Sequence, residues 1–193
     1  MNKILMNQSE IFEKYCLDKE HALEVEKYSV MLFEALNGII FDFSKKEKAY
    51  LCSAAKLHDI GYYIEKKSHH KHTMDLILQE GLEGFDEEET LIVANIARYH
   101  RNSLPDEAEH EFYAKLTDNS KDLVNKLASL LRIADGLDKP HKNLILRIRT
   151  EKTNDCLNLF IKTIGFKPSL KAAEHKKDLF ESTFNTQLNF IIE

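Results

Sequence analysis

Apolar residues recur every three or four positions along the first two thirds of the chain, which is the spacing of amphipathic helices. Several of these runs carry recognisable ends. Asn37-Gly38 stops the first, and Ser44 with Glu47 forms a capping box that opens the second, which should end near Gly61. The helices expected from the pattern cover residues 18–36, 44–61, 69–79, 86–100 and 120–136, with an irregular stretch at 101–119.

Beyond Pro140 the pattern changes to strict alternation of apolar and polar residues. Residues 144–148 and 157–161 therefore read as strands, and a last alternating run covers 188–192. A helical stretch rich in Lys and Glu lies between them, at 169–184. The predicted fold class is mainly α: a helical bundle over residues 1–142, followed by a small α+β subdomain over residues 143–193 that packs on it.

Composition supports a compact, helix-rich soluble protein, because 43% of the 193 residues are hydrophobic and only 6 are Gly and 3 Pro. The net charge of -5 argues against an extended nucleic-acid surface. Residues 1–10 contain neither a long apolar run nor a basic cluster, so we expect a cytoplasmic protein with no membrane partner. The cysteines are odd in number and lack a paired spacing, which predicts free, buried thiols at Cys16, Cys52 and Cys156.

Histidine and aspartate residues occupy helix faces that should be buried. Burying imidazoles and carboxylates among apolar side chains is costly unless a counter-charge or ligand compensates each one, and a divalent metal would do so. The adjacency of His58 and Asp59 favours two ions, because consecutive helix positions point in different directions. The candidate ligands are His21, His58, Asp59, His100 and Asp135, with His72 as a further contributor from another helix.

Imidazole and carboxylate ligands without thiolate suit Fe, Mn, Zn, Co or Ni, and Mg is a further candidate for the bound ion. The alternative for each buried His is an ordinary hydrogen bond in the core, and Asp135 could pair with Arg132. His69 and His70 are expected to be exposed.

Several basic residues lie near these ligands in the sequence and are candidates for binding substrate phosphate. Arg98 and Arg101 bracket His100 by one turn or less, so at least one should overhang a cavity that holds the ion. The alternative for these residues is a solvated helix surface. The candidates for substrate binding are Lys71, Arg98, Arg101, Arg132 and Lys139.

The order His21, His58-Asp59, Asp135 resembles the HD superfamily of metal-dependent phosphohydrolases, which is all-helical. Within it, the chain resembles the C-terminal half of the exopolyphosphatase and guanosine pentaphosphate phosphohydrolase family over roughly residues 18–193. The motifs that carry this resemblance are LHDIGYYI at 57–64, HHKH at 69–72, ARYHR at 97–101 and LLRIADGLD at 130–138.

The resemblance implies an HD-type bundle with His21, His58, Asp59 and Asp135 around a first metal. In two-metal relatives further His residues hold the second ion, and His72 and His100 stand at those positions, with Asp59 as the bridge. A further His of some relatives is replaced by Arg101. Full-length exopolyphosphatases also have an actin-like N-terminal half with Gly-rich loops, which this sequence lacks, so the fold and the ligand set are what the resemblance transfers.

The function expected from these residues is metal-dependent hydrolysis of a nucleotide, an alarmone or another small phosphate ester or anhydride by an activated water. Asp59 would orient the water, and Arg98 or Arg101 would neutralise phosphoryl charge. One alternative is a non-catalytic module that binds polyphosphate or nucleotide and regulates a partner, and another is an oxidative di-iron enzyme. The expected ligand is a small phosphorylated molecule or polyphosphate, and a homodimer is compatible with the sequence.

Overall fold

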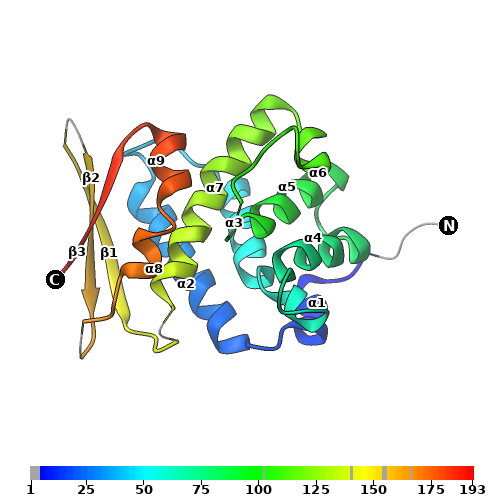
Figure 1. The fold of residues 1–193 in the computed structure, drawn as a ribbon, viewed down its shortest axis with the longest axis horizontal. Coiled ribbons are helices and arrows are strands. Elements are labelled where there is room, and N and C mark those ends of the chain that lie inside the picture. Colours follow the sequence, from blue (N-terminus) through cyan, green and yellow to red (C-terminus); the bar gives the residue numbers. More distant parts are fainter. Residues whose placement is uncertain (1–4, 102, 140, 154–155, 166) are drawn as a thin grey trace.

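The structure is a computed structural model that describes residues 5–101, 103–139, 141–153, 156–165 and 167–193. Helices fill most of the molecule, and a small sheet lies at one end beside the C-terminus (Figure 1). The helices are α1 Gln8–Tyr15, α2 Lys19–Leu36, α3 Lys45–Leu57, the 3-10 helix η1 Ile60–Tyr63, α4 His69–Glu80, α5 Glu87–Arg98, α6 Glu111–Ala114, α7 Asp118–Leu137, α8 Lys171–Glu174 and α9 Asp178–Phe184. The strands are β1 Ile145–Lys152, β2 Cys156–Thr163 and β3 Gln187–Ile192. The predicted mainly α fold with a small α+β part is confirmed.

Helix ends follow the capping chemistry of the sequence. Ser44 caps α3 and Asp86 caps α5, each with a Glu three residues later that returns a hydrogen bond to the cap backbone. The sequence prediction differs from the structure in several places, and the predicted helix 44–61 is α3 followed by the separate 3-10 helix η1. Short helices α1 and α6 were not expected, α7 begins at Asp118 because Thr117 is its cap, and the predicted helix 169–184 is divided into α8 and α9.

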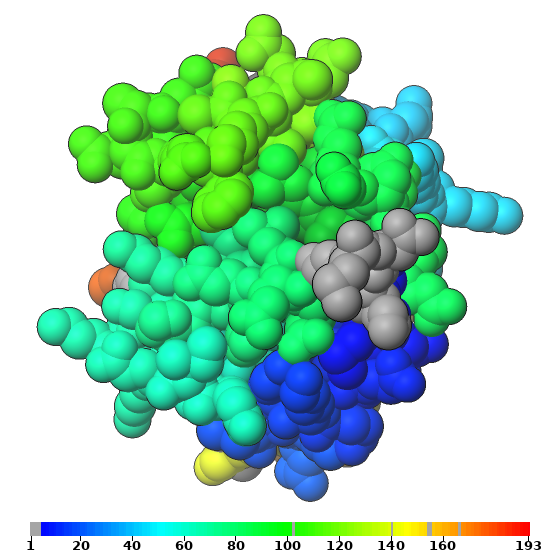
Figure 2. All heavy atoms as spheres, turned by 90° about the vertical axis from the view of Figure 1, so that its right-hand side faces the viewer, coloured from blue at the N-terminus to red at the C-terminus, as the bar shows by residue number. Residues whose placement is uncertain are grey.

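The helical core is built by α2, α3, α5 and α7, which pack against one another. Their inward stripes bury large side chains completely, among them Leu32, Leu51, Ile96 and Leu131. The end of the molecule opposite the sheet is covered by helical segments, with α1 beside the segment that contains α4 (Figure 2). Long-range packing of four amphipathic helices therefore supplies a rigid frame for polar side chains placed between them.

The sheet has the order β1-β2-β3, with β1 and β2 antiparallel and β2 and β3 parallel. Its inner face packs on α2, and Tyr28 on that helix accepts a hydrogen bond of 3.1 Å from the backbone N–H of Ile145. Leu157, Leu159 and Leu188 on this face are fully buried in the same hydrophobic cluster as the helices. The helical and α+β parts thus share one continuous core.

All three cysteines are free thiols, as predicted, but only Cys16 is buried, and Cys52 and Cys156 are half-buried. Nowhere in the described ranges does a helix combine the length and the apolar character that a membrane crossing requires.

Candidate metal centre

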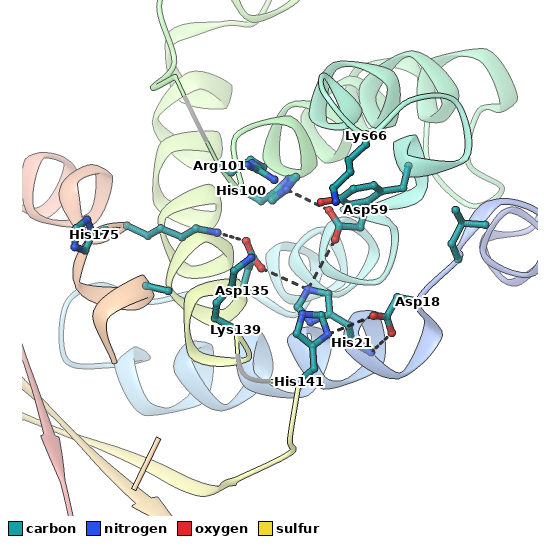
Figure 3. A pocket seen from close by; sticks show the side chains of 14 residues that line it. Asp18, His21, Asp59, Lys66, His100, Arg101, Asp135, Lys139, His141 and His175 are labelled. Carbon is teal, nitrogen blue, oxygen red and sulfur yellow. Dashed lines mark hydrogen bonds and ion pairs between the residues drawn. The ribbon is translucent and has the colours of Figure 1, made fainter. Parts of the chain in front are cut away.

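Four side chains from three separate parts of the chain converge between α2, α3 and α7. Nε2 of His21 lies 3.4 Å from Oδ1 of Asp135 and 3.8 Å from Oδ2 of Asp59. Nε2 of His58 lies 3.4 Å from the same Asp59 oxygen. Figure 3 shows His21 between the two carboxylates. These are the four residues that the sequence assigned to a first metal, and the structure brings them together.

A second group of side chains consists of Asp59, His69 on α4 and His100 just after α5, so it shares Asp59 with the first group. Oδ1 of Asp59 lies 3.1 Å from Nε2 of His69 and 3.3 Å from Nε2 of His100. The two ring nitrogens face each other at 3.2 Å. Asp59 therefore presents one oxygen to each group, as a bridging carboxylate would.

Backbone carbonyl groups fix the tautomer of three of these imidazoles. Nδ1 of His58 donates to Ala55 O at 2.7 Å, Nδ1 of His69 to Lys66 O at 3.0 Å, and Nδ1 of His100 to Ala97 O at 2.7 Å. A carbonyl oxygen can only accept, so each Nδ1 carries a proton, and in the neutral imidazole each Nε2 presents a lone pair. In known metal sites, a hydrogen bond donated by the ring nitrogen that does not bind the metal orients the imidazole in the same way.

Two buried atoms of this cluster make no hydrogen bond with any residue that the structure describes: Nε2 of His58 and Oδ1 of Asp59. Both are acceptors, and both point towards other acceptors. Leaving buried acceptors facing one another costs free energy, and a cation placed among them removes that cost. The donor set, imidazole nitrogen with carboxylate oxygen and no thiolate, fits a first-row divalent metal.

The ring nitrogens of His21 lie within 4 Å of three carboxylates, those of Asp59, Asp135 and Asp138. Burial opposes its protonation, yet hydrogen bonds to Asp135 and Asp138 raise the pKa of His21 to about 10. Burial outweighs the nearby Asp59 carboxylate and lowers the pKa of His100 to about 4, so this imidazole is neutral and able to ligate.

Short local contacts set the geometry of His21. Asp18 caps α2 by accepting a hydrogen bond from the backbone N–H of His21 at 3.1 Å, which places His21 in the first turn. Oδ2 of Asp138 lies 2.7 Å from Nδ1 of His21. Nε2 is thereby turned towards Asp59 and Asp135, in the carboxylate–imidazole arrangement common behind metal ligands.

Close backbone packing around Gly61 aligns α3, η1 and α4. Thr73 on α4 donates to the carbonyl of His58 at 2.8 Å and accepts from the N–H of Gly61 at 3.0 Å. A Cβ at Gly61 would lie 1.9 Å from the carbonyl oxygen of His69. Only glycine permits this approach, which brings His69 on α4 close to His58 and Asp59.

The two groups together, called the ligand cluster below, lie at the edge of a cavity of about 580 Å³. Asp59, His100 and Asp135 reach this cavity, and Arg101 and Lys66 flank it on the side of His100 (Figure 3). The space is large enough for a small phosphorylated molecule. The side chains that line it are those of Leu17, Asp18, His21, Asp59, Tyr62, Lys66, His100, Arg101, Asp135, Lys139, His141, Ala172, His175 and Lys176.

Comparison with protein families gives a match that covers both the ligand cluster and the cavity. The sequence model described as Ppx/GppA phosphatase, domain III, matches residues 7–176. The chain belongs to this family. The match to Ppx/GppA phosphatase domain III supports the resemblance to the C-terminal half of the exopolyphosphatase and guanosine pentaphosphate phosphohydrolase family. The matched segment includes every residue proposed above as a metal ligand.

Curated relatives of this domain III protein are considerably longer than the chain. It is 28% identical over 131 residues to a guanosine-5'-triphosphate,3'-diphosphate pyrophosphatase of Pseudoalteromonas translucida, which covers 63% of the chain and 24% of the relative. Proteins of the same name from Vibrio campbellii and Vibrio vulnificus are 30% and 27% identical over 47% and 64% of the chain, and over 18% and 24% of their own length. The alignments thus span about a quarter of these relatives or less.

His69, not His72, joins the second group. His69 and His70 were predicted to be exposed, and this prediction is wrong, because both are buried on the face of α4 that carries Thr73 and Ile77. His72 lies on another face, where its ring nitrogens are 3.7 Å from Glu65 and 3.8 Å from Asp75. The structure does not bring His72 to the cluster.

Of the basic residues assigned to substrate, Arg101 and Lys139 line the main cavity, and Lys71, Arg98 and Arg132 do not. Lys71 and Arg98 line a separate cavity of about 220 Å³, and the Arg98 guanidinium lies 5.5 Å from the ring centre of Tyr99. The direction in which α5 ends explains the difference, because Arg98 is its last residue and Arg101 follows beyond the turn that holds His100.

Arg132 has a structural role instead of the predicted contact with substrate or Asp135. It is buried, donates to the carbonyl of Tyr99 at 3.1 Å, and binds both carboxylate oxygens of Asp178 at 2.9 and 3.2 Å. One guanidinium thus ties α7 to the end of α5 and to the start of α9.

We expect Arg132→Met to destabilise the fold without removing a cavity residue. Loss of the buried guanidinium leaves the buried carbonyl of Tyr99 without this donor and removes the ion pair with Asp178, which should lower the free energy of unfolding by about 2–4 kcal/mol. Urea denaturation of the variant measures this change. Lys115→Met, which breaks an exposed ion pair with Glu111, is the control and should change it by less than about 0.5 kcal/mol. Equal stability of the two variants would show that Arg132 does not hold these elements together.

Sequence reasoning did not find several residues of the candidate ligand groups, of their supporting contacts and of the cavity. His69 could have been found, because it continues the stripe of Thr73, Leu76 and Ile77. Asp138 could also have been found, since it follows Asp135 by three residues and shares its helix face. No local pattern marks the remaining ones, which reach the cavity from loops and short turns: Tyr62, Lys66, His141, His175 and Lys176.

Proposed function

We propose that the chain is a metal-dependent phosphohydrolase domain of HD type that acts on a nucleotide or another small phosphorylated molecule. The observation that carries the proposal is the convergence of buried Nε2 lone pairs on the two oxygens of Asp59, at the edge of a cavity with cationic walls. The names of the pyrophosphatase relatives support a phosphoanhydride substrate, although the alignments cover only 24% of the length of those proteins.

The residues divide into those that would hold metal and those that would bind phosphate. His21, His58, Asp59 and Asp135 would hold one divalent ion, and Asp59, His69 and His100 a second. Such ions supply Lewis-acid activation of water and of a phosphoryl oxygen. The donor set allows Mn, Fe, Co, Ni, Zn or Mg.

The remaining steps rest on the chain's own side chains. Arg101 and Lys139 are placed to neutralise negative charge on phosphoryl oxygens, and Lys66 extends the same cationic wall. Asp59 is the carboxylate nearest both ligand groups, so it is the residue that would orient an attacking water between them. Asp138 would keep Nε2 of His21 directed at the site.

Hydrolysis is tested by measuring phosphate release from nucleotides, guanosine polyphosphates, inorganic polyphosphate and a simple phosphate ester, each with Mn, Fe, Co, Ni, Zn or Mg. We expect release that depends on metal and is lost in Asp59→Asn. Equal rates in the variant and the wild type would exclude the proposed mechanism.

A regulatory binding module is the second candidate, favoured by the observation that the chain matches only about a quarter of its relatives. In that case the cationic walls would bind a polyphosphate or a nucleotide without turnover. Isothermal titration with polyphosphate in the presence of chelator separates the two functions. Undiminished binding without metal, combined with no phosphate release, would favour the module.

Substitution of His69 and His72 distinguishes the two candidates for the second ion. We expect His69→Ala to lose one of two bound ions, because His69 faces Asp59, and His72→Ala to retain both, because its partners are outside the cavity. Metal content after equilibration with Mn²⁺ and desalting, read by plasma mass spectrometry, gives the ratio of ion to chain. Loss of an ion in His72→Ala alone would restore the assignment made from the sequence.

A further inference from the structure

Lys176 reaches the ligand cluster from the turn between α8 and α9. Its Nζ donates to Oδ2 of Asp135, while Oδ1 of the same carboxylate lies 3.4 Å from Nε2 of His21. The side chain of Lys176 is 19% exposed and lines the main cavity. An ammonium therefore stands at the border between the proposed metal ligands and the space for substrate.

The position of this ammonium is fixed by residues on both sides of Asp135 in α7. Arg132 donates to the carbonyl of Lys176 at 3.4 Å and binds Asp178 two residues later. A Cβ at Gly136 would lie 2.6 Å from Cα of Ala173, so a glycine is needed for α8 to lie this close to α7. One turn of α7 thus supplies Asp135 and also holds the segment that carries Lys176.

The hydrogen-bond capacity of Lys176 exceeds what Asp135 uses. An ammonium has three N–H donors, and Oδ2 of Asp135 is its one hydrogen-bond acceptor among the residues that the structure describes. The cavity side of the group is open, so the other two donors can reach a bound oxyanion. Lys139 lines the same cavity, and Arg101 and Lys66 stand across from Asp135 (Figure 3).

We propose that Lys176 binds a phosphoryl oxygen of the substrate, so that the C-terminal segment 143–193 completes the phosphate site. The inference rests on the proposed function and adds to it a substrate-binding residue from outside the helical bundle. The competing account gives Lys176 only the task of neutralising Asp135, in which case a ligand would not sense its removal.

The test measures Mn²⁺ binding and then, at saturating Mn²⁺, inorganic phosphate binding, both by isothermal titration. Lys176→Met keeps the aliphatic stem and removes the charge, and Lys176→Arg keeps the charge. Lys171→Met is the matched control, since Lys171 is an exposed residue of the same segment that does not line the cavity. Thermal unfolding establishes that each variant is folded.

We expect Lys176→Met to keep its Mn²⁺ stoichiometry and to bind phosphate at least about tenfold more weakly, the effect of losing a charge-assisted hydrogen bond. Lys176→Arg should stay within about threefold of the wild type, and Lys171→Met should match it. Unchanged phosphate affinity in Lys176→Met would overturn the inference. Loss of Mn²⁺ from the same variant, or no phosphate binding by the wild type, would also overturn it.

A failure of the proposed hydrolysis would give a result different from a failure of the inference about Lys176. If the wild type binds Mn²⁺ and phosphate but releases no phosphate from any substrate, hydrolysis is excluded. A weakened phosphate affinity in Lys176→Met would then still place Lys176 in an anion-binding site.

Discussion

Asp59→Asn should lose both metal binding and hydrolysis while the fold remains intact. Asp59 is the one residue common to the two ligand groups, with Oδ2 near His21 and His58 and Oδ1 near His69 and His100. The amide keeps the shape of the carboxylate but removes its charge and one of its acceptors. Since loss of an outer partner of a metal ligand already weakens binding by about 10–100-fold, loss of a shared ligand should weaken Mn²⁺ binding by at least about 100-fold.

The control for this change is Asp75→Asn, because Asp75 is an exposed acid on α4 outside the cavity. We expect it to bind Mn²⁺ and to release phosphate as the wild type does. Titration with Mn²⁺ and circular dichroism of both variants would separate loss of a ligand from loss of the fold. Wild-type Mn²⁺ affinity in Asp59→Asn would contradict the shared-ligand arrangement.

Gly61→Ala should cause a large loss of stability, because the added Cβ would overlap backbone atoms of α4. The added Cβ would lie 1.9 Å from the carbonyl oxygen of His69 and 2.5 Å from the N–H nitrogen of Thr73, and both of these are backbone atoms of α4. Relief requires α4 to move away from η1, which breaks the hydrogen bonds of Thr73 and displaces His69. We expect a loss of about 3 kcal/mol or more in the free energy of unfolding, together with a lower Mn²⁺ stoichiometry.

Gly84→Ala is the matched control. Gly84 has a φ of +87° and nothing within 4 Å of a Cβ, so alanine there should cost only the strain of the left-handed conformation, about 1–2 kcal/mol, and leave metal binding unchanged. Urea denaturation and metal analysis of the two variants give the comparison. A Gly61→Ala protein as stable as Gly84→Ala would show that α4 does not depend on this close contact.

The spacing of apolar residues predicted the helical core and much of the ligand cluster. Both depend on the recurrence of buried positions every three or four residues along a helix. His21 and Asp135 occupy apolar stripes of long helices, so their inward direction could be predicted from spacing alone. His69 was misjudged because two adjacent histidines in a polar run resemble surface, and only the later residues of α4 show which face is buried.

Residues beyond helix ends were the least predictable. Whether Arg98 or Arg101 reaches the cavity depends on how the chain turns after α5, and Lys176 reaches Asp135 only because α8 packs against Gly136. Both outcomes are set by contacts between segments that are distant in sequence, and no single-sequence pattern records such contacts. The parallel pairing of β3 with β2 is non-local in the same way.

The most direct test of a shared cation is anomalous scattering from crystals of the protein grown with Mn²⁺. We expect one peak among His21, His58, Asp59 and Asp135 and another among Asp59, His69 and His100. Well-ordered side chains with no anomalous peak at either position would contradict the proposal that a metal holds these imidazoles and carboxylates together.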